Sequence, residues 1–137
     1  MIKQLAISLT NTKVNNLIIT QNDNECPVKD LKLSFKNYFN KSEDKTFRLV
    51  FEIIVPHKEG LIFNVEYEAI FITNEPIDEN FMRSPFTKIN APAIAFPFLR
   101  AYISTLMTLS GYSPLILPTI NFSENISEDK TEIDIDK

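Results

Sequence analysis

Alternating apolar and polar positions mark four segments in the first half of the chain. They are QLAISLTNTKV (4–14), VKDLKLSFKNYF (28–39), TFRLVFEIIV (46–55) and LIFNVEYEAIFI (61–72). A period of two, rich in Phe, Ile and Val, is typical of strands that bury one face. The polar stretch 40–45 and the stretch PHKEG at 56–60 predict short turns, and Gly60 can take the positive φ that such turns often need. We therefore predict a four-stranded antiparallel meander with one face in the core.

The opposite face of this predicted sheet carries both acidic and aliphatic residues. Its members are Val50, Glu52, Ile54, Ile62, Glu66, Glu68, Ile70 and Ile72. One interpretation is a partly covered sheet with ordinary exposed aliphatics. The other is a surface that meets further polypeptides, because sizeable exposed apolar patches usually mark interaction sites.

The period changes to about 3.6 between Ala95 and Ser110, which predicts one long helix. An apolar stripe on this helix is expected to face the core; it consists of Phe96, Leu99, Ile103, Leu106 and Met107. Gly111 suits the position after the helix, and Pro114 prevents a restart. Pro97 is tolerated in a first turn. We therefore expect the helix to begin near Ala95 or Phe96, after an extended lead-in at 90–94.

A second stripe of small residues runs along the same helix. It consists of Ala101, Ser104, Thr105 and Thr108. Small side chains allow another helix to approach closely, and because only one long helix is predicted, that helix would come from a second copy of the chain. The alternative is that this stripe faces water or the sheet.

The chain after the helix divides into two parts. Residues 112–122 place apolar side chains between prolines and are expected to pack as extended chain. Residues 123–137 hold six acidic residues and two lysines, a net charge of −4, and show no wide apolar stripe. Polar, acidic composition is typical of disordered segments. We predict an α+β domain at 1–122 and a short, irregular and disordered acidic tail at 123–137.

The composition limits the number of domains, the cellular compartment and the classes of partner that we expect. A length of 137 residues suits one domain, and 44% hydrophobic residues are enough for a core. A single cysteine excludes an intrachain disulfide and favours a reducing compartment. No secretion signal or apolar run of about 18 residues is evident, so a cytoplasmic protein without membrane insertion is expected. Since the charge outside the tail is balanced, nucleic acid is not expected as a partner.

Catalytic constellations are missing from the sequence. His57 stands alone, Cys26 precedes a proline in a polar linker, and two glycines cannot form a phosphate-binding loop. Glu52, Glu66 and Glu68 could face one another across strands, but a solvated or partner-binding face is the better interpretation. We predict no metal, no cofactor and no enzyme activity, and favour a binding protein.

One segment, NAPAIAFPFLRAYISTLMTLSGYSPLILPTINF at 90–122, resembles the SecB family of bacterial protein-export chaperones. The matching features are an aromatic-Pro-aromatic step followed by Arg, then a helix, a Gly, and a Pro-rich exit that ends in Asn-Phe. They fall on Phe96, Pro97, Phe98, Arg100, Gly111, Pro114, Leu115, Leu117, Pro118, Asn121 and Phe122. The order of four strands before a helix also agrees with the family.

The resemblance implies an ATP-independent holdase that binds unfolded polypeptides and delivers preproteins to the export motor SecA. It implies a homotetramer, a dimer of dimers, with helices packed between sheets that two subunits build together; Ala101, Ser104, Thr105 and Thr108 would then be interface residues. The expected client-binding residues are Ile70, Phe71, Ile72, Leu115 and Leu117, although a core position is an equally good interpretation of each. The acidic residues Glu52, Glu66 and Glu68 are the expected contacts for the basic tail of SecA.

One departure from the family keeps alternatives open. A second helix follows the Asn-Phe step in the family, whereas SENISEDKTEIDIDK follows Phe122 here. A SecB-like chaperone that serves a toxin–antitoxin pair is therefore an alternative role. A binder of small apolar ligands, with a closed cavity in a monomer, and a structural subunit that buries all its apolar surface in assembly are further alternatives.

Overall fold

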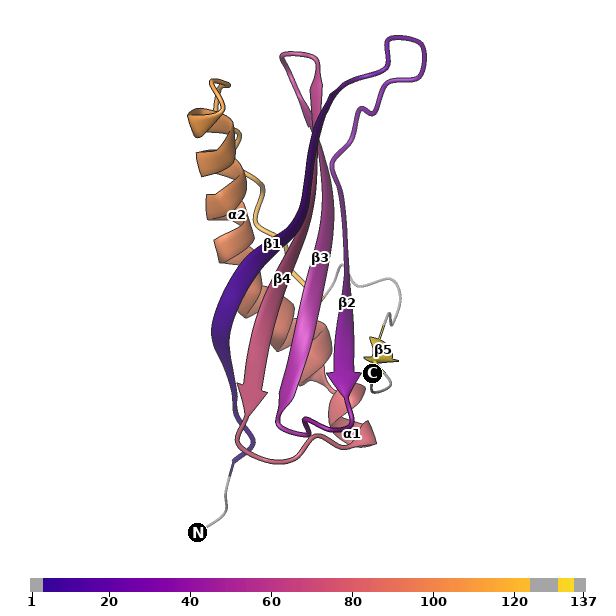
Figure 1. Cartoon of the computed structure of the whole chain (residues 1–137), viewed down its shortest axis with the longest axis vertical. Helices are drawn as coiled ribbons and strands as arrows, with labels where there is room; N and C mark the ends of the chain where they lie inside the picture. Colours follow the sequence, from indigo (N-terminus) through magenta and orange to yellow (C-terminus); the bar gives the residue numbers. More distant parts are fainter. Residues whose placement is uncertain (1–3, 124–130, 135–137) are drawn as a thin grey trace.

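The structure of this chain is a computed structural model that describes residues 4–123 and 131–134. Its elements are β1 (Ile7–Gln21), β2 (Lys32–Asn40), β3 (Thr46–His57), β4 (Leu61–Thr73), α1 (Glu79–Met82), a π-helical turn η1 (Phe86–Asn90), α2 (Ala91–Leu109) and β5 (Thr131–Asp134). The strands form one sheet in the order β1-β4-β3-β2-β5. The long helix α2 crosses one face of this sheet and leaves the other face open (Figure 1).

The predicted antiparallel strands are confirmed, but their order is not that of a simple meander. Strands β2, β3 and β4 follow one another as hairpins, and Gly60 in the tight β3–β4 turn has a φ of 83°. Strand β1 pairs with β4 instead of β2. The ten residues 22–31 connect β1 to β2 across the sheet, and this non-local pairing leaves no period in the sequence that could reveal it.

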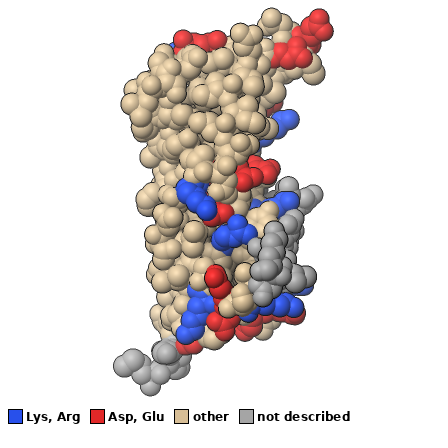
Figure 2. Space-filling model, viewed as in Figure 1, with Lys and Arg blue, Asp and Glu red and all other residues tan. Residues whose placement is uncertain are grey.

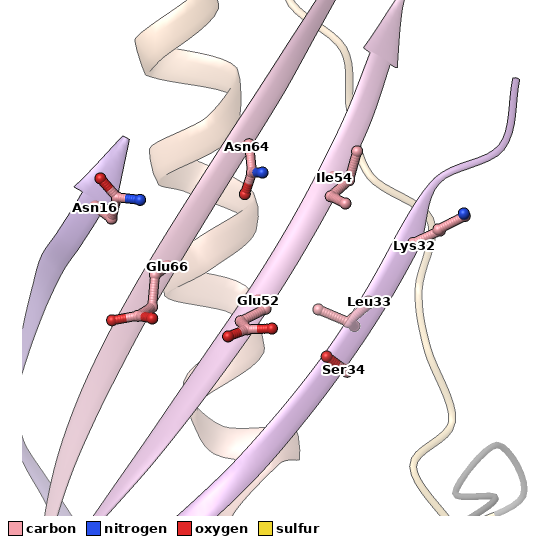
Figure 3. A pocket seen from close by; sticks show the side chains of 8 residues that line it. All are labelled: Asn16, Lys32, Leu33, Ser34, Glu52, Ile54, Asn64 and Glu66. Atoms are coloured by element: carbon pink, nitrogen blue, oxygen red, sulfur yellow. The ribbon is translucent and has the colours of Figure 1, made fainter. Parts of the chain in front are cut away.

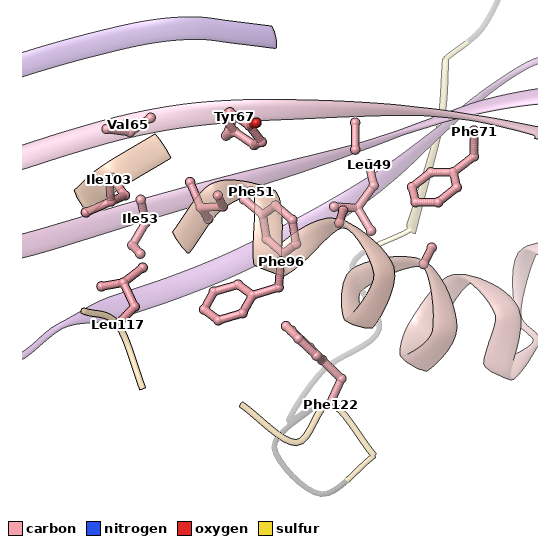
Figure 4. Close-up of a cluster of buried hydrophobic side chains, with 14 of the residues drawn as sticks. Leu49, Phe51, Ile53, Val65, Tyr67, Phe71, Phe96, Ile103, Leu117 and Phe122 are labelled. Carbon is pink, nitrogen blue, oxygen red and sulfur yellow. The ribbon is translucent and has the colours of Figure 1, made fainter. Parts of the chain in front are cut away.

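The core lies between the helix and the inner face of β3 and β4 (Figure 4). Phe51 is fully buried and contacts the rings of Phe96 and Phe122, at 6.1 and 6.4 Å between ring centroids. Phe47 stacks on Phe71 at 5.1 Å. The predicted helix stripe is confirmed: Phe96, Leu99, Ile103 and Met107 are buried, and Leu106 is partly buried against the core.

The start of the helix differs from the expectation. Helix α2 begins at Ala91 and carries Pro92 in its first turn, so Pro97 lies inside the helix and not at its start. Pro97 has no N–H for the carbonyl of Ala93, but both residues are exposed, so water can take the place of the missing hydrogen bond. The expected extended lead-in at 90–94 is therefore helical, because Pro92 already provides the favoured N-terminal φ.

The segment after the helix is held against the β3–β4 turn. Glu59 donates its backbone N–H to Nδ1 of His57 at 3.1 Å, so Nε2 carries the proton and donates to the carbonyl of Ser113 at 2.7 Å. The N–H of Ser113 donates to Oε2 of Glu59 at 3.2 Å. This segment then buries Leu117 and Phe122. The lone histidine, His57, is buried and thus has a structural role: its ring connects the β3–β4 turn to the segment after α2 through hydrogen bonds.

Part of the acidic tail has regular structure, in contrast to the expected irregular segment. Residues 131–134 form β5, which pairs in parallel with β2. The remainder of the predicted tail beyond Ser123 lies outside the described residues. The free backbone edge of β2 explains the strand, because an unpaired edge offers hydrogen bonds to any extended segment nearby.

The helical region Glu79–Leu109 is long and apolar enough to cross a membrane by length and composition, with a mean hydropathy of 1.2 over its best window. This differs from the expectation that no such run exists. The core helix of a water-soluble domain passes the same test, and here Leu99 and Ile103 pack the helix on the sheet. The finding therefore carries little weight for a membrane role.

Candidate functional site

An uncharged apolar surface lies on the side of α2 that faces away from the sheet. Ile94 and Phe98 are 40% and 50% exposed, and Ala101, Thr105 and Thr108 continue the same stripe at helical spacing. We call these five residues the outer helix face. Arg100 is the one charged residue of α2, and its Nε is buried without a hydrogen-bond partner in the described part of the chain.

A second exposed apolar surface belongs to β1, an outermost strand of the sheet. Val14, Leu17, Ile18 and Ile19 are between 37% and 44% exposed. Val14, Leu17 and Ile19 pair with the buried residues Tyr67, Val65 and Phe63 of β4 and so lie on the helix side of the strand, whereas Ile18 pairs with the exposed Asn64 and lies on the outer side. We call these four residues, which come from both sides of the strand, the β1 surface. Figure 2 shows a wide uncharged area on the left of the molecule, where β1 and the end of α2 lie in Figure 1.

A polar hollow of about 510 Å³ opens on the outer face of the sheet (Figure 3). Its lining consists of Asn16, Lys32, Leu33, Ser34, Glu52, Ile54, Asn64 and Glu66. Glu52 and Glu66 stand directly opposite each other on β3 and β4. Neither carboxylate has an ion pair within residues 4–123, so like charges face one another there without neutralisation.

Glu68 does not belong to this acidic pair in the way the sequence suggested. It is 2% exposed, and its carboxylate binds Arg48 at 3.0 Å and Lys13 at 3.5 Å. Asn15 donates a further hydrogen bond to it at 3.2 Å. Because its charge is already neutralised and covered, Glu68 is a structural residue and offers nothing to a basic partner.

The five expected client-binding residues do not form one surface. Phe71 and Leu117 are 0% and 1% exposed, so the structure corrects the expectation and places both in the core. Ile70 is half-buried and Ile72 is 45% exposed, both on the outer face of the sheet. Leu115 is exposed on the opposite side, beside α2, where its N–H lies 3.4 Å from the sulfur of Met107.

The predicted small-residue stripe does reach the surface. Ala101, Thr105 and Thr108 are exposed, and Ser104 is half-buried. Ile94 and Phe98 extend this stripe by two turns toward the N-terminus. The sequence did not reveal this, because Ile94 precedes the predicted helix start and Phe98 is large where the predicted stripe is small. The β1 surface was not predicted either, because LIIT at 17–20 lacks the alternation used to delimit the strand.

A smaller pocket of about 270 Å³ lies between the β2–β3 turn and α1. Phe39, Ile77 and Met82 contribute apolar surface to it. Its acidic lining residues are Glu43, Asp44, Asp78 and Glu79. An apolar side chain flanked by basic residues would complement this pocket, which sequence reasoning could not find because its two walls are distant in the chain.

The described residues hold no group of three His, Cys, Asp or Glu side chains placed to bind a metal ion. Cys26 is an exposed free thiol. Burial, followed by the nearby Tyr67, raises the pKa of Tyr102 above its ordinary value. These two tyrosines stack at 5.6 Å between the helix and the sheet, so this shift reflects packing and does not mark a reactive group.

The sequence is similar to known protein-export proteins. Residues 2–132 match the family described as Preprotein translocase subunit SecB. An uncharacterized protein of Methanocaldococcus jannaschii is 31% identical over 124 residues, which cover 80% of each chain. The protein-export protein SecB of Orientia tsutsugamushi is 34% identical over 78% of this chain and 68% of its own length. For SecB of Zymomonas mobilis the identity is 38%, but the match covers only 40% of that protein.

Solved structures share the fold at low sequence identity. A SecB-like chaperone of Mycobacterium tuberculosis, solved with a peptide from the antitoxin HigA1, has a TM-score of 0.59 and is 11% identical; the match covers 84% of this chain and 90% of that one. A protein of unknown function from Streptococcus agalactiae has a TM-score of 0.57 and is 12% identical over 85% of this chain and all of that one. At such identities the likeness concerns the fold alone.

Proposed function

The chain belongs to the SecB family, and we propose from this membership that it is an ATP-independent chaperone that holds unfolded polypeptides for Sec-dependent export. Proteins of this family are chaperones and not enzymes. The preproteins it would hold and their delivery to SecA are parts of the same proposal.

The observation that supports this function best is the large apolar surface that the folded chain leaves exposed. Ile72, Leu115 and Ile116 are 45%, 38% and 77% exposed, while many other aromatic and aliphatic side chains are buried in the core. Removing apolar surface from water is worth about 25 cal/mol per Å² and depends little on direction. Such surfaces therefore suit clients of many sequences better than one defined small ligand.

We propose that the outer helix face forms the contact between copies of the chain. The exposed residues Ala101, Thr105 and Thr108 allow close approach, and Ser104 lies at the border of the face. The β1 surface is the second proposed contact, which would join two sheets and give a dimer of dimers.

Client contacts are proposed on the apolar side chains that remain outside these interfaces. They are Ile70 and Ile72 on the outer sheet face, and Leu115 with Ile116 after the helix. The polar hollow of about 510 Å³ is lined mainly by polar side chains and opens on the sheet surface. It is not the closed apolar cavity that the small-ligand alternative required.

Two measurements on the purified protein test this function. We expect light scattering to give the mass of an oligomer, and we expect the protein to delay the aggregation of a chemically denatured enzyme without ATP. A lysozyme control at equal mass concentration accounts for non-specific protection. A stable monomer that leaves the aggregation rate unchanged would contradict the proposed function.

We propose that Glu52 and Glu66 meet the basic tail of SecA. The double variant Glu52→Gln/Glu66→Gln removes two unpaired charges and is expected to weaken binding to SecA about three- to tenfold, because exposed ion pairs contribute only about 0.2–1 kcal/mol each. Calorimetry at low and high salt measures the effect. The control variant Glu25→Gln/Glu43→Gln removes two exposed acids elsewhere and should bind as the parent does. Equal binding by both variants would exclude this surface.

A dedicated role with an antitoxin is the second candidate function. The structural neighbour from M. tuberculosis holds a peptide of its antitoxin, which shows that this fold is compatible with a specific client. The two roles differ in client range. A holdase for export is expected to protect several unrelated denatured proteins, whereas a dedicated chaperone protects one. A gene neighbourhood with a toxin–antitoxin pair would favour the second role.

A further inference from the structure

We propose that the outer backbone edge of β2 is a docking site for an extended segment of an unfolded polypeptide, and that the chain's own strand β5 occupies this edge until a client displaces it. This inference rests on the chaperone function proposed above and specifies one way in which a client is held. The C-terminal strand is then a built-in competitor for the client.

The pairing of β5 shows that the edge accepts an extended strand. Strand β2 pairs with β3 on one side, and on the other side β5 runs parallel to it from Asn37↔Thr131 to Asn40↔Asp134. Backbone groups at a sheet edge bind an added strand through main-chain hydrogen bonds, whatever its sequence. In Figure 1, β5 lies beside the end of β2, at the border of the sheet opposite β1.

The same pairing is short enough to be displaced. Strand β5 uses only four of the nine positions of β2. Parallel pairs are slightly weaker than antiparallel ones, and the entropy cost of ordering four residues is comparable to the gain from a few hydrogen bonds. A client segment that pairs along all of Lys32–Asn40 has more than twice as many positions to bind, so it can replace β5.

Covalent connection keeps β5 near the edge despite this weakness. Seven residues, 124–130, join Ser123 to Thr131. An intramolecular segment of this kind has an effective concentration on the order of millimolar at its site. A client must therefore bind the edge more tightly than β5 does at this effective concentration. This requirement favours long extended segments over short peptides.

The surroundings of the edge indicate the chemistry of the client. Phe39 is 2% exposed on β2, and Phe35 contacts the ring of Phe122 at 5.8 Å, so one side of the edge is apolar. Asn37 donates its side-chain amide to the carbonyl of Thr87, but its buried Oδ1 lacks a partner in the described part of the chain. Alternate residues of an added strand lie on the two faces of the sheet. An apolar residue beside Phe39 and a Ser or Thr beside Asn37 would fit.

Charge selects among such segments. Lysines recur along and beside β2 at positions 29, 32, 36 and 41, whereas the segment after Phe122 has a net charge of −4. Figure 2 shows both basic and acidic side chains on the lower right of the face, on the side where β2 lies in Figure 1. Along its lysine-bearing start the edge therefore suits neutral or acidic extended segments better than basic ones, whereas the acidic residues Glu43 and Asp44 lie beside its end at Asn40.

The first test compares variants of the tail for binding to fluorescently labelled, reduced and carboxymethylated α-lactalbumin, an acidic polypeptide without stable structure. If β5 occupies the edge about 80–90% of the time, deletion of 124–137 should lower the apparent Kd about five- to tenfold. Glu132→Pro/Ile133→Pro should have the same effect, because proline cannot donate to the ladder. The matched control Glu132→Asp/Ile133→Val keeps the strand and should bind as the parent does.

A disulfide lock provides the opposite change. Asn40 and Asp134 are register partners, so Asn40→Cys/Asp134→Cys, in a Cys26→Ser background, should join β5 to β2 on oxidation. The oxidised protein is expected to bind α-lactalbumin at least fivefold more weakly than the same protein after reduction. Equal affinity in the two redox states would overturn the proposal.

Hydrogen exchange locates the site and separates this proposal from the chaperone function. Amides of Asn37–Asn40 should exchange faster after tail deletion and regain protection when α-lactalbumin binds. Parent and deleted proteins that bind equally tightly, or a deleted protein that binds more weakly, would overturn the edge proposal but leave the chaperone function intact. Failure of every variant to bind an unfolded polypeptide would overturn both.

Discussion

Phe98→Asp is expected to dissociate the proposed oligomer and to raise its dissociation constant at least 100-fold. Phe98 is the largest side chain of the outer helix face and is 50% exposed in the single chain, so the substitution leaves the core packing of each chain intact. In an assembly, a carboxylate at this position would be buried in an apolar contact without a partner. Such a buried charge costs several kcal/mol, and each 1.4 kcal/mol is tenfold in affinity.

Sedimentation velocity across a concentration series measures this change in mass, and circular dichroism shows whether the fold is retained. Asn80→Asp is the matched control, because it adds the same charge at an exposed position of α1 that lies off the outer helix face. The control should keep the mass of the parent. If Phe98→Asp also keeps that mass, the outer helix face is not a contact between copies.

The Phe98→Asp variant also tests which residues bind the client. Leu115 and Ile116 lie on the segment after the helix, outside the outer helix face, so a dissociated chain should still offer them to a client. We expect the Phe98→Asp variant to bind an unfolded polypeptide with reduced affinity, because a long client loses the avidity of several linked sites. The separate effects on mass and affinity distinguish an assembly residue from a client-binding residue.

Local patterns predicted the elements of this fold because burial on one side leaves a clear period in the sequence. The alternation in 46–55 and 61–72 identified β3 and β4, and the stripe from Phe96 to Met107 identified the buried side of α2. The small-residue stripe that borders it also proved to be largely exposed. Each of these predictions depends only on residues within one element.

Features set by distant partners were beyond such patterns. Glu68 follows the same alternation as Glu66, yet Arg48 and Lys13 cover it from neighbouring strands. The alternation in 61–72 already places Phe71 and Ile72 on opposite faces, but only the packing of Phe71 against Phe47 shows that no surface of Phe71 remains for a client. The pairing of β1 with β4 and of β5 with β2 depends on free sheet edges. Backbone groups form these edges, so no pattern of residue types in the sequence predicts which strand will pair there.

Phe51→Ala is expected to lower the free energy of unfolding by about 3–5 kcal/mol, the usual cost of removing a buried aromatic ring. Phe51 is fully buried, and its ring lies 6.1 Å from those of both Phe35 and Phe96. Its loss would leave a cavity between the sheet and the helix. Because domains are stable by only about 5–15 kcal/mol, this single change removes a large share of the total.

Urea unfolding at one fixed protein concentration measures the loss, because assembly makes apparent stability concentration-dependent. Lys58→Ala is the control: Lys58 is exposed in the β3–β4 turn, away from the outer helix face, so its truncation should change stability by less than about 0.5 kcal/mol. Phe51→Leu should lie between the two, since it keeps part of the buried volume. A loss below about 1 kcal/mol for Phe51→Ala would mean that this ring does not connect the sheet to the helix, contrary to the expectation for a buried aromatic.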